Sequence, residues 1–504
     1  MLLEIHAHTN RHSKCSAIDP VTLVRKIVNK GLQGLIITEH HYLWSEEELS
    51  RLREEAGVDQ WFVLLAGQEV DTDFGHVLIY GAGESIESKT SLKTLRRHFP
   101  DAALVWAHPF RKGSAPSKTE LSSPLLDGIE IFSLNHTPKE NWEGLKSWHE
   151  LKFTALSGSD THSEANAGVL PTQFDHTVKT IAEAAGEIRG GRVRPFIKEI
   201  PKSGSELTVT EITMGTKGDD ELRQRIIIKA VNNERKWDKT QHTAELLRDI
   251  YDHGFGGPVF RVPKILDINE KDMTLIEEGQ RGKNLYDSLL SVGRAPGMTY
   301  FEHAARWIAK FHALKLRPRT GEGVQARENK KFLSYAENFR KTANSRLEQA
   351  SGLIDYVTKT EEEIYRDKSG SFVLNHGDYH PKNIIIGHDR TNDPGTLYIS
   401  VIDFASSFYF TPAFDVGYFL AQFAAQFSAF PEILERYDEK IFLDAYRDGA
   451  PPLTDEFLKD VDLFKIRANL SIANYLIRVG KGESPELYGL ITKSAALKDS
   501  SLAR

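Results

Sequence analysis

The sequence has one cysteine, Cys15, among 504 residues, and it has no long uninterrupted run of apolar residues. A single thiol cannot form an intramolecular disulfide, and it excludes a cysteine-rich zinc motif. No apolar stretch approaches the length of about 20 residues that a membrane-spanning helix needs. The N-terminal segment MLLEIHAH soon becomes polar and is unlike a signal peptide. These absences favour a cytoplasmic protein without a membrane partner.

An excess of charge of one sign is also lacking. The 64 Lys and Arg residues nearly balance 71 Asp and Glu residues, which gives a formal net charge of −7. This balance gives no reason to expect a nucleic acid or an anionic membrane as partner. Hydrophobic residues make up 40% of the chain, which is enough at this length for more than one buried core. We therefore expect a globular protein of several domains.

The first 195 residues alternate short apolar segments with amphipathic ones. Asp19 and Pro20 are typical of a helix start, and Gly31 is typical of a helix end. This alternation predicts an α/β domain with a largely parallel sheet or barrel. The segments that we expect to form buried strands are MLLEI, GLIIT, WFVLLAG, ALVWA, DGIEIF and FTALSG.

Imidazoles and carboxylates follow six of these predicted strands. In a β/α barrel the residues just past successive strands converge on one face, where active sites are built. A single histidine in such a place is more often structural, but six coincident strand ends favour a metal site. Nitrogen and carboxylate ligands suit zinc, manganese or iron, and there are too many for one tetrahedral ion. We expect two or three divalent metals, held from the set His6, His8, His40, Glu69, His108, His136, Asp160 and His162.

The motifs HAH, TEH, GQE, AHP and GSDTH, in this order, resemble those of the PHP (polymerase and histidinol phosphatase) superfamily. The resemblance covers residues 1–195, and it implies a distorted seven-stranded β/α barrel that cleaves phosphoesters. By position, it implies one ion held by His6, His8, Glu69 and Asp160. Glu69 would bridge to a second ion bound by His108 and His136, and His40 and His162 would hold a third. Glu39 stands where the family usually has aspartate, and for His76 a structural and a functional role remain equally open.

A second set of motifs lies in HGDYHPKN (376–383) and VIDF (401–404). The first is a polar loop between two apolar segments, so we expect a loop between two short strands. Phosphoryl transfer to an alcohol needs a carboxylate to accept the hydroxyl proton, a role that suits Asp378. It also needs Mg²⁺ held through oxygen, which Asn383 and Asp403 can supply.

The order of these residues resembles the aminoglycoside phosphotransferase branch of the protein-kinase-like fold, and FDVGY with Asp415 is similar to the helix start that follows there. The resemblance implies an α+β bilobal domain at 196–504, with a small lobe at about 200–280 and a large lobe at about 281–504. It also implies ATP as phosphate donor, with Lys229 binding its phosphates and Glu245 pairing with that lysine. The strands on either side of TKGDDE would form a hairpin.

The two resemblances together predict a bifunctional enzyme. One half would be a metal-dependent phosphoesterase and the other an ATP- and Mg²⁺-dependent kinase of a small-molecule hydroxyl, so the partners are an acceptor substrate and a phosphoester substrate. A regulator or sensor, in which one domain binds nucleotide or phospholigand and controls the other, is the alternative. A protein kinase is a third possibility, but HGD and IDF replace the HRD and DFG motifs of that class.

Overall fold

The computed structural model divides the chain into two compact units. It describes residues 1–203, 207–216, 223–316, 324–342, 344–390, 393–448 and 453–503. The first unit is Met1–Val231 with Leu266–Gly279, and the second is Asn232–Ile265 with Gln280–Arg504. The predicted boundary at 195/196 falls within the first unit, and the division into domains 1–195 and 196–504 stays a prediction.

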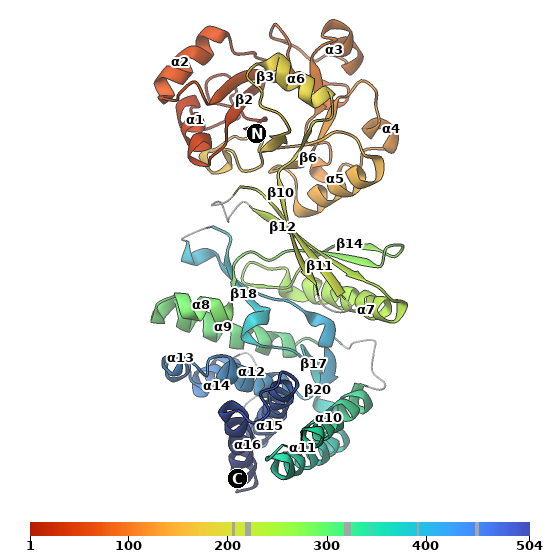
Figure 1. The fold of residues 1–504 in the computed structure, drawn as a ribbon, viewed down its shortest axis with the longest axis vertical. Coiled ribbons are helices and arrows are strands. Elements are labelled where there is room, and N and C mark those ends of the chain that lie inside the picture. The colour runs from red at the N-terminus through yellow and green to blue at the C-terminus, as the bar shows by residue number, and fades with distance from the viewer. Residues whose placement is uncertain are drawn as a thin grey trace. The chain divides into compact units, whose positions relative to one another are not determined.

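The first unit begins with a nine-stranded, barrel-like sheet in the order β7-β6-β5-β4-β3-β2-β1-β8-β9 (Figure 1). The pairs β1–β2, β2–β3, β5–β6 and β6–β7 are parallel, whereas β3–β4, β4–β5, β1–β8 and β8–β9 are antiparallel. The strands are β1 (Leu2–Glu4), β2 (Gly34–His40), β3 (Val63–Thr72), β4 (Gly75–Tyr80), β5 (Ala103–Trp106), β6 (Gly128–Ser133), β7 (Ala155–Gly158), β8 (Thr172–Phe174) and β9 (Val193–Pro195).

All six predicted strands are present, but the barrel has more strands and more antiparallel pairs than the sequence suggested. One reason is the tight turn between β3 and β4, where Gly75 has φ +88° and the Thr72 hydroxyl donates to the Gly75 carbonyl at 2.8 Å. Such a turn reverses the chain, so β4 returns antiparallel instead of crossing over through a helix. The α/β class is therefore right, and the nine-stranded, barrel-like sheet is compatible with the distorted barrel that the resemblance implied, while its identity as a PHP barrel stays a prediction.

Helices connect the strands of this barrel. Asp19 caps the first helix as predicted, because its carboxylate accepts from the Thr22 backbone N–H at 3.0 Å, and Pro20 occupies the first helical position. The helices are α1 (Pro20–Asn29), α2 (Glu46–Ala56), α3 (Leu92–His98), α4 (Lys118–Leu121), α5 (Pro138–Leu151) and α6 (Ile181–Arg189).

A second, five-stranded sheet in the order β10-β11-β12-β15-β14 belongs to the same unit. The expected hairpin is present, because β11 and β12 pair antiparallel; residues 217–222, which hold most of its predicted loop, lie outside the described residues. Ile212, Ile226 and Ile276 share one buried cluster with Ile131 and Leu170 of the barrel. The strands are β10 (Ile197–Ser203), β11 (Leu207–Met214), β12 (Gln224–Val231), β14 (Ile265–Asn269) and β15 (Thr274–Glu278).

The second unit is mostly helical, with α15 beside α16 and α10 beside α11 (Figure 1). Within the described residues, no helix is both long and apolar enough to span a bilayer. The strands of the second unit are β13 (Phe260–Arg261), β16 (Lys283–Asn284), β17 (Val373–Asn375), β18 (Ile384–His388), β19 (Leu397–Val401) and β20 (Phe408–Phe410). Its helices are α7 (Glu234–Ile250), α8 (Leu285–Ser291), α9 (Arg294–His312), α10 (Val324–Lys341), α11 (Leu347–Lys368), α12 (Ala413–Gln426), α13 (Pro431–Arg436), α14 (Glu439–Arg447), α15 (Asp455–Arg478) and α16 (Pro485–Ala503).

Gly417 sets the close approach of α12 to α15. A Cβ atom at this position would lie 2.6 Å from the Val461 carbonyl oxygen and 2.7 Å from the Phe464 Cβ. We expect Gly417→Ala to lower the free energy of unfolding of the second unit by about 1–3 kcal/mol, because α12 and α15 must separate. Gly352→Ala in α11 is the matched control, since a Cβ there meets no atom within 4 Å. Urea unfolding measures both, and an equal effect of the two variants would contradict this account.

Candidate metal centre and phosphoryl-transfer site

Four predicted ligands come together in the barrel. His6 and His8 follow β1, Glu69 lies in β3 and Asp160 follows β7, and all four side chains are buried. One ligand atom from each lies within 4.8 Å of the others. The separations are 3.2 Å for His6 Nε2 to His8 Nε2, 3.5 Å for His6 Nε2 to Glu69 Oε2, 3.3 Å for His6 Nε2 to Asp160 Oδ1, 3.1 Å for His8 Nε2 to Glu69 Oε2 and 3.3 Å for His8 Nε2 to Asp160 Oδ1.

These separations match a tetrahedral metal site. Nitrogen and oxygen ligands about 2.0–2.1 Å from a tetrahedral ion lie about 3.3–3.4 Å from one another. The Asp160 Oδ1 atom is buried, and no hydrogen bond of regular geometry reaches it from the described residues, although the His6 and His8 nitrogens each lie 3.3 Å away. A buried carboxylate oxygen without a donor is costly unless a cation compensates it. The four residues therefore fit a divalent ion.

Electrostatics keeps the carboxylates of this group ionised. Burial by itself raises the pKa of the Asp160 carboxyl, but the His6 and His8 imidazoles outweigh it and hold that pKa below its ordinary value. At Glu69, burial alone would likewise raise the carboxyl pKa, but His6, His108 and His76 hold that pKa below its ordinary value. An ionised carboxylate is the form that binds a metal.

Two further groups share residues with the first. His8, His40 and His162 form one, and Glu69, His76 and His108 form the other. Glu69 Oε1 lies 2.7 Å from His76 Nδ1 and 3.3 Å from His108 Nε2, while Glu69 Oε2 faces the first group. Glu69 thus belongs to two of the groups through its two oxygens, and its role as a bridging ligand stays a prediction. The three groups overlap as a polynuclear centre would.

His76 belongs to one of the three groups, whereas His136 belongs to none of them. His76, for which the sequence left both roles open, lies beside Glu69, because the antiparallel strand β4 brings it back to β3. His136 is buried after β6 but belongs to none of the three groups found among the described residues. Its role as a ligand of the second ion stays a prediction.

Glu39 is held as a structural acid. Its carboxylate accepts from the Thr9 backbone N–H at 3.2 Å, from the Ser13 hydroxyl at 2.5 Å and from the Trp44 indole at 3.2 Å. These donors use its oxygens, and it stands in none of the three metal-compatible groups. Hydrogen bonds within the barrel therefore anchor the glutamate that stands where the resembling family usually has aspartate.

Backbone strain marks the same face of the barrel. His108 and Asp160 have φ values of +31° and +45°, which non-glycine residues rarely adopt. Such conformations persist where the surrounding structure enforces them, and they concentrate at functional sites. The strain therefore lies on two of the predicted ligands.

The predicted kinase loop of the second unit lies between β17 and β18, as expected. Asp378 accepts from the Tyr418 hydroxyl at 2.7 Å through Oδ1 and from the Asn383 side-chain amide at 3.3 Å through Oδ2. Asn383 also donates to the Asp378 carbonyl at 3.0 Å. Because the Asn383 nitrogen makes these contacts, its amide oxygen is left for a cation. The structure thus brings Asp378 and Asn383 together.

Asp415 holds the start of this loop. Its carboxylate accepts from the backbone N–H groups of His376 at 2.6 Å and Gly377 at 2.9 Å, and His312 Nε2 lies 3.2 Å from Oδ2. The side chains of Asp415 and His312 are buried on helices α12 and α9. The conformation of the loop is therefore fixed from the helical core.

Asp403 follows β19 in a left-handed conformation with φ +70°. The preceding Ile402 donates its backbone N–H to the Asn383 carbonyl at 3.0 Å, which joins the two loops. Burial lowers the pKa of His380, and the Asp378 and Asp403 carboxylates oppose that change. The charges of both carboxylates therefore act on His380, a residue that the sequence analysis did not predict to belong to the site. The Asp403 side chain is exposed and open to a ligand.

Lys229 lies on β12 in the first unit, where its ammonium donates to the Glu277 carboxylate at 2.9 Å. Glu277 lies on the neighbouring strand β15, two residues beyond the partner of Lys229 in the register, so both side chains share a face. The sequence did not predict this pair. Glu245 lies on α7 of the second unit, and its pairing with Lys229 stays a prediction.

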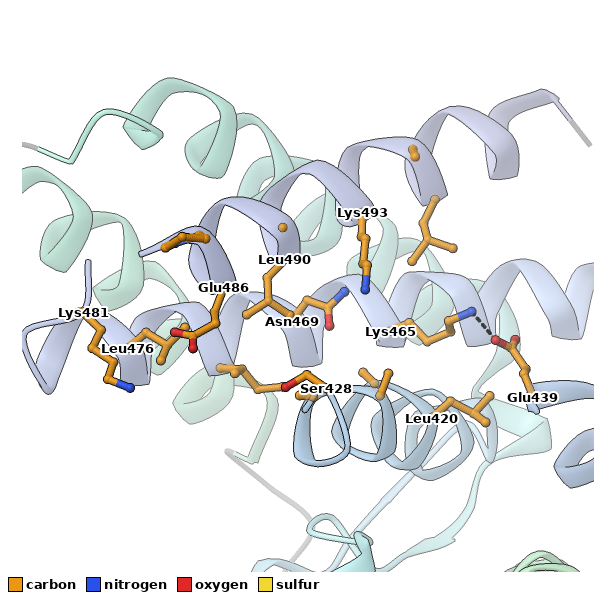
Figure 2. A pocket seen from close by; sticks show the side chains of 18 of the residues that line it. Leu420, Ser428, Glu439, Lys465, Asn469, Leu476, Lys481, Glu486, Leu490 and Lys493 are labelled. Atoms are coloured by element: carbon orange, nitrogen blue, oxygen red, sulfur yellow. Dashed lines mark hydrogen bonds and ion pairs between the residues drawn. The ribbon is translucent and has the colours of Figure 1, made fainter. Parts of the chain in front are cut away.

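A groove of about 960 Å³ lies between α12, α15 and α16 (Figure 2). One leucine from each helix lines the groove, namely Leu420, Leu476 and Leu490, and Lys493 points into it from α16. At one end Lys465 donates to Glu439 at 2.7 Å. None of the predicted kinase residues lines this groove, so it is separate from the loop that carries Asp378.

Comparison with known proteins identifies the class of the C-terminal part. Residues 218–451 match the family model described as "Phosphotransferase enzyme family". This part of the chain is therefore a phosphotransferase-family domain with a kinase-like fold, and its predicted resemblance is confirmed. The family match does not extend to residues 1–195.

Solved structures with similarity to the chain include three kinases or phosphotransferases. An ethanolamine kinase from Plasmodium vivax is 15% identical, with a TM-score of 0.40, over 60% of this chain and 81% of that one. A choline kinase from Cryptosporidium parvum is 13% identical, with a TM-score of 0.41, over 61% and 90%. An aminoglycoside phosphotransferase from Streptomyces rimosus is 15% identical, with a TM-score of 0.36, over 53% and 91%. A search of curated proteins found no match.

Proposed function

We propose that the chain is a bifunctional enzyme. Its barrel would be a metal-dependent phosphoesterase, and its phosphotransferase-family domain would transfer phosphate from ATP to the hydroxyl of a small molecule. The observation that carries the first activity is the group of four buried ligand atoms at tetrahedral spacing. The family match, together with the placement of Asp378 and Asn383, supports the second.

In the barrel, His6, His8, Glu69 and Asp160 would hold one ion, and Glu69 would share a second with His108. Bound divalent ions would neutralise phosphate oxygens and acidify a water to a pKa of about 7. The protein's own contribution is rigidity. The His6 Nδ1 atom lies 3.0 Å from the buried Glu130 carboxylate, which orients the imidazole so that Nε2 faces the centre.

In the phosphotransferase-family domain, Asp378 would orient the acceptor hydroxyl and accept its proton. Asn383 and Asp403 would hold Mg²⁺ through oxygen, and Lys229 would bind the phosphates of ATP. Tyr418 and Asn383 hold one carboxylate oxygen each, so the Asp378 carboxylate has a fixed orientation before any substrate binds. A fixed base lowers the entropic cost of reaching the reactive geometry.

The metal content of the purified protein tests the barrel. We expect two or three transition-metal ions per chain in a preparation made without chelators, measured by elemental analysis. Chelation should abolish hydrolysis of a generic phosphoester, while ATP-dependent phosphorylation persists once Mg²⁺ is restored. Less than one ion per chain after reconstitution would rule out the phosphoesterase.

A screen for ATP consumption with small alcohols, sugars, amino alcohols and nucleosides tests the kinase. We expect one of these classes to raise ATP turnover above the rate with water alone. ATP binding without turnover for any class would instead favour a regulatory role for this domain.

A further inference from the structure

A chain of three side chains joins the barrel to strand β12. The His136 imidazole Nδ1 lies 3.0 Å from the Asn141 Oδ1 atom. Asn141 Nδ2 donates to Gln224 Oε1 at 2.7 Å, and Gln224 Nε2 donates to the His136 carbonyl at 3.1 Å. Asn141 lies on α5 and Gln224 opens β12, and both belong to the first unit. His136 is thus held from the five-stranded sheet.

Two backbone groups fix the direction of every hydrogen bond in this chain. The His136 carbonyl can only accept, so the amide nitrogen of Gln224 faces it and the Gln224 oxygen faces Asn141. The Ser133 backbone N–H can only donate, and it donates to Asn141 Oδ1 at 3.2 Å. Because that same oxygen faces His136 Nδ1, the proton of the neutral imidazole lies on Nδ1. The Nε2 atom therefore carries the lone pair.

The Nε2 atom of His136 is buried and makes no hydrogen bond of regular geometry among the described residues, although the backbone of His108 lies beside the ring. The whole residue is only 2% exposed. A buried nitrogen lone pair without a donor costs free energy unless a cation uses it. An imidazole that ligates a metal commonly donates its other N–H to an acceptor, which fixes the tautomer and the ring orientation. Asn141 provides that acceptor here.

We infer that Asn141 and Gln224 are positioning residues that hold His136 as a metal ligand. This inference rests on the proposed metal centre and deepens it: the strand that carries Lys229 also orients an imidazole at the end of a barrel strand. The same junction has a separate anchor, where Trp142 Nε1 and the Lys146 ammonium donate to Asp267 at 3.0 Å and 2.7 Å. That anchor does not touch His136 and serves as a control.

The test measures metal binding by four full-length variants and the unaltered chain. We expect Gln224→Ala and Asn141→Leu to weaken the binding of one ion by about 10- to 100-fold, the usual effect of losing a residue that orients a ligand. Asn141→Asp keeps an oxygen opposite Nδ1 but cannot donate to Gln224 Oε1, so we expect its loss of affinity to lie between those of the unaltered chain and Asn141→Leu. Lys146→Ala loosens the other anchor and should leave every ion in place. Titration against a chromophoric chelator gives the affinities, and the absorption spectrum of the cobalt-loaded protein reports the ligand set.

The outcomes separate this inference from the proposed function. An unaltered chain with less than one ion contradicts the metal centre itself. Full metal binding by Gln224→Ala and Asn141→Leu, in a chain that does bind two or three ions, overturns the positioning role alone. Equal losses in Lys146→Ala and Gln224→Ala would overturn it too, because general loosening of the junction would then explain both. A retained ion at His6, His8, Glu69 and Asp160 shows that each variant is folded.

Discussion

Replacing Asp378 with asparagine is expected to lower the turnover number of phosphoryl transfer by about 100- to 10,000-fold, the range of general-base catalysis. Asparagine keeps the shape of the side chain and can still accept from Tyr418, but it cannot take the hydroxyl proton. ATP affinity should be nearly unchanged, because the proposed nucleotide contacts come from other residues. Steady-state kinetics with the acceptor found by screening, together with calorimetric ATP binding, measures both quantities.

Tyr418→Phe is the matched control for that variant. It removes the hydroxyl that donates to Asp378 Oδ1 at 2.7 Å but leaves the carboxylate. We expect a smaller loss of turnover than in Asp378→Asn, since the base is still present but less firmly oriented. Full activity of Asp378→Asn would show that Asp378 is not the general base.

Glu69→Gln should have the largest effect in the barrel. Glu69 lies within 3.5 Å of His6, His8 and His40 through one oxygen and within 3.3 Å of His76 and His108 through the other. An amide supplies one neutral oxygen in place of two anionic ones, so neither ion keeps its shared ligand. We expect loss of most bound metal and of phosphoester hydrolysis, with ATP-dependent phosphorylation retained. Elemental analysis and the two activity assays decide it.

Glu39→Gln is the control for Glu69→Gln. Glu39 is equally buried and also lies in a strand of the barrel, but its oxygens accept from Thr9, Ser13 and Trp44. We expect this variant to lose stability while it keeps its metal ions. Equal metal loss in both variants would mean that any buried acid on this face supports the centre only by holding the fold.

Strand ends were the part of the site that the sequence could predict. His6, His8, Glu69 and Asp160 follow or end apolar runs, and chain connectivity alone brings such ends to one face. The sequence could not decide between a structural and a functional role for His76, because its position depends on the chain reversal at Gly75, which makes β4 antiparallel to β3. Glu277 was missed for a similar reason, since its contact with Lys229 depends on strand register.

The fold, like the site, was predictable only where it depends on local sequence. Capping residues and apolar runs predicted α1 and the six main strands, because these depend on local sequence. Strands β4, β8 and β9 were not predicted, and β8 and β9 have only three residues each, which carry too little periodicity to show. The chain order of the loop 376–383 and Asp403 predicted the second site, but the support from Tyr418 depends on the packing of α12.

Ile212, Ile226 and Ile276 pack in one cluster with Ile131 of the barrel. This packing limits where the chain can be truncated without exposing apolar surface. A fragment that ends at residue 195 keeps Ile131 but loses the three isoleucines that cover it. The apolar surface so exposed is the kind that drives self-association of truncated proteins. Soluble expression of the barrel therefore calls for a chain that continues through Val231 and carries the Leu266–Gly279 segment, the two stretches that share its compact unit.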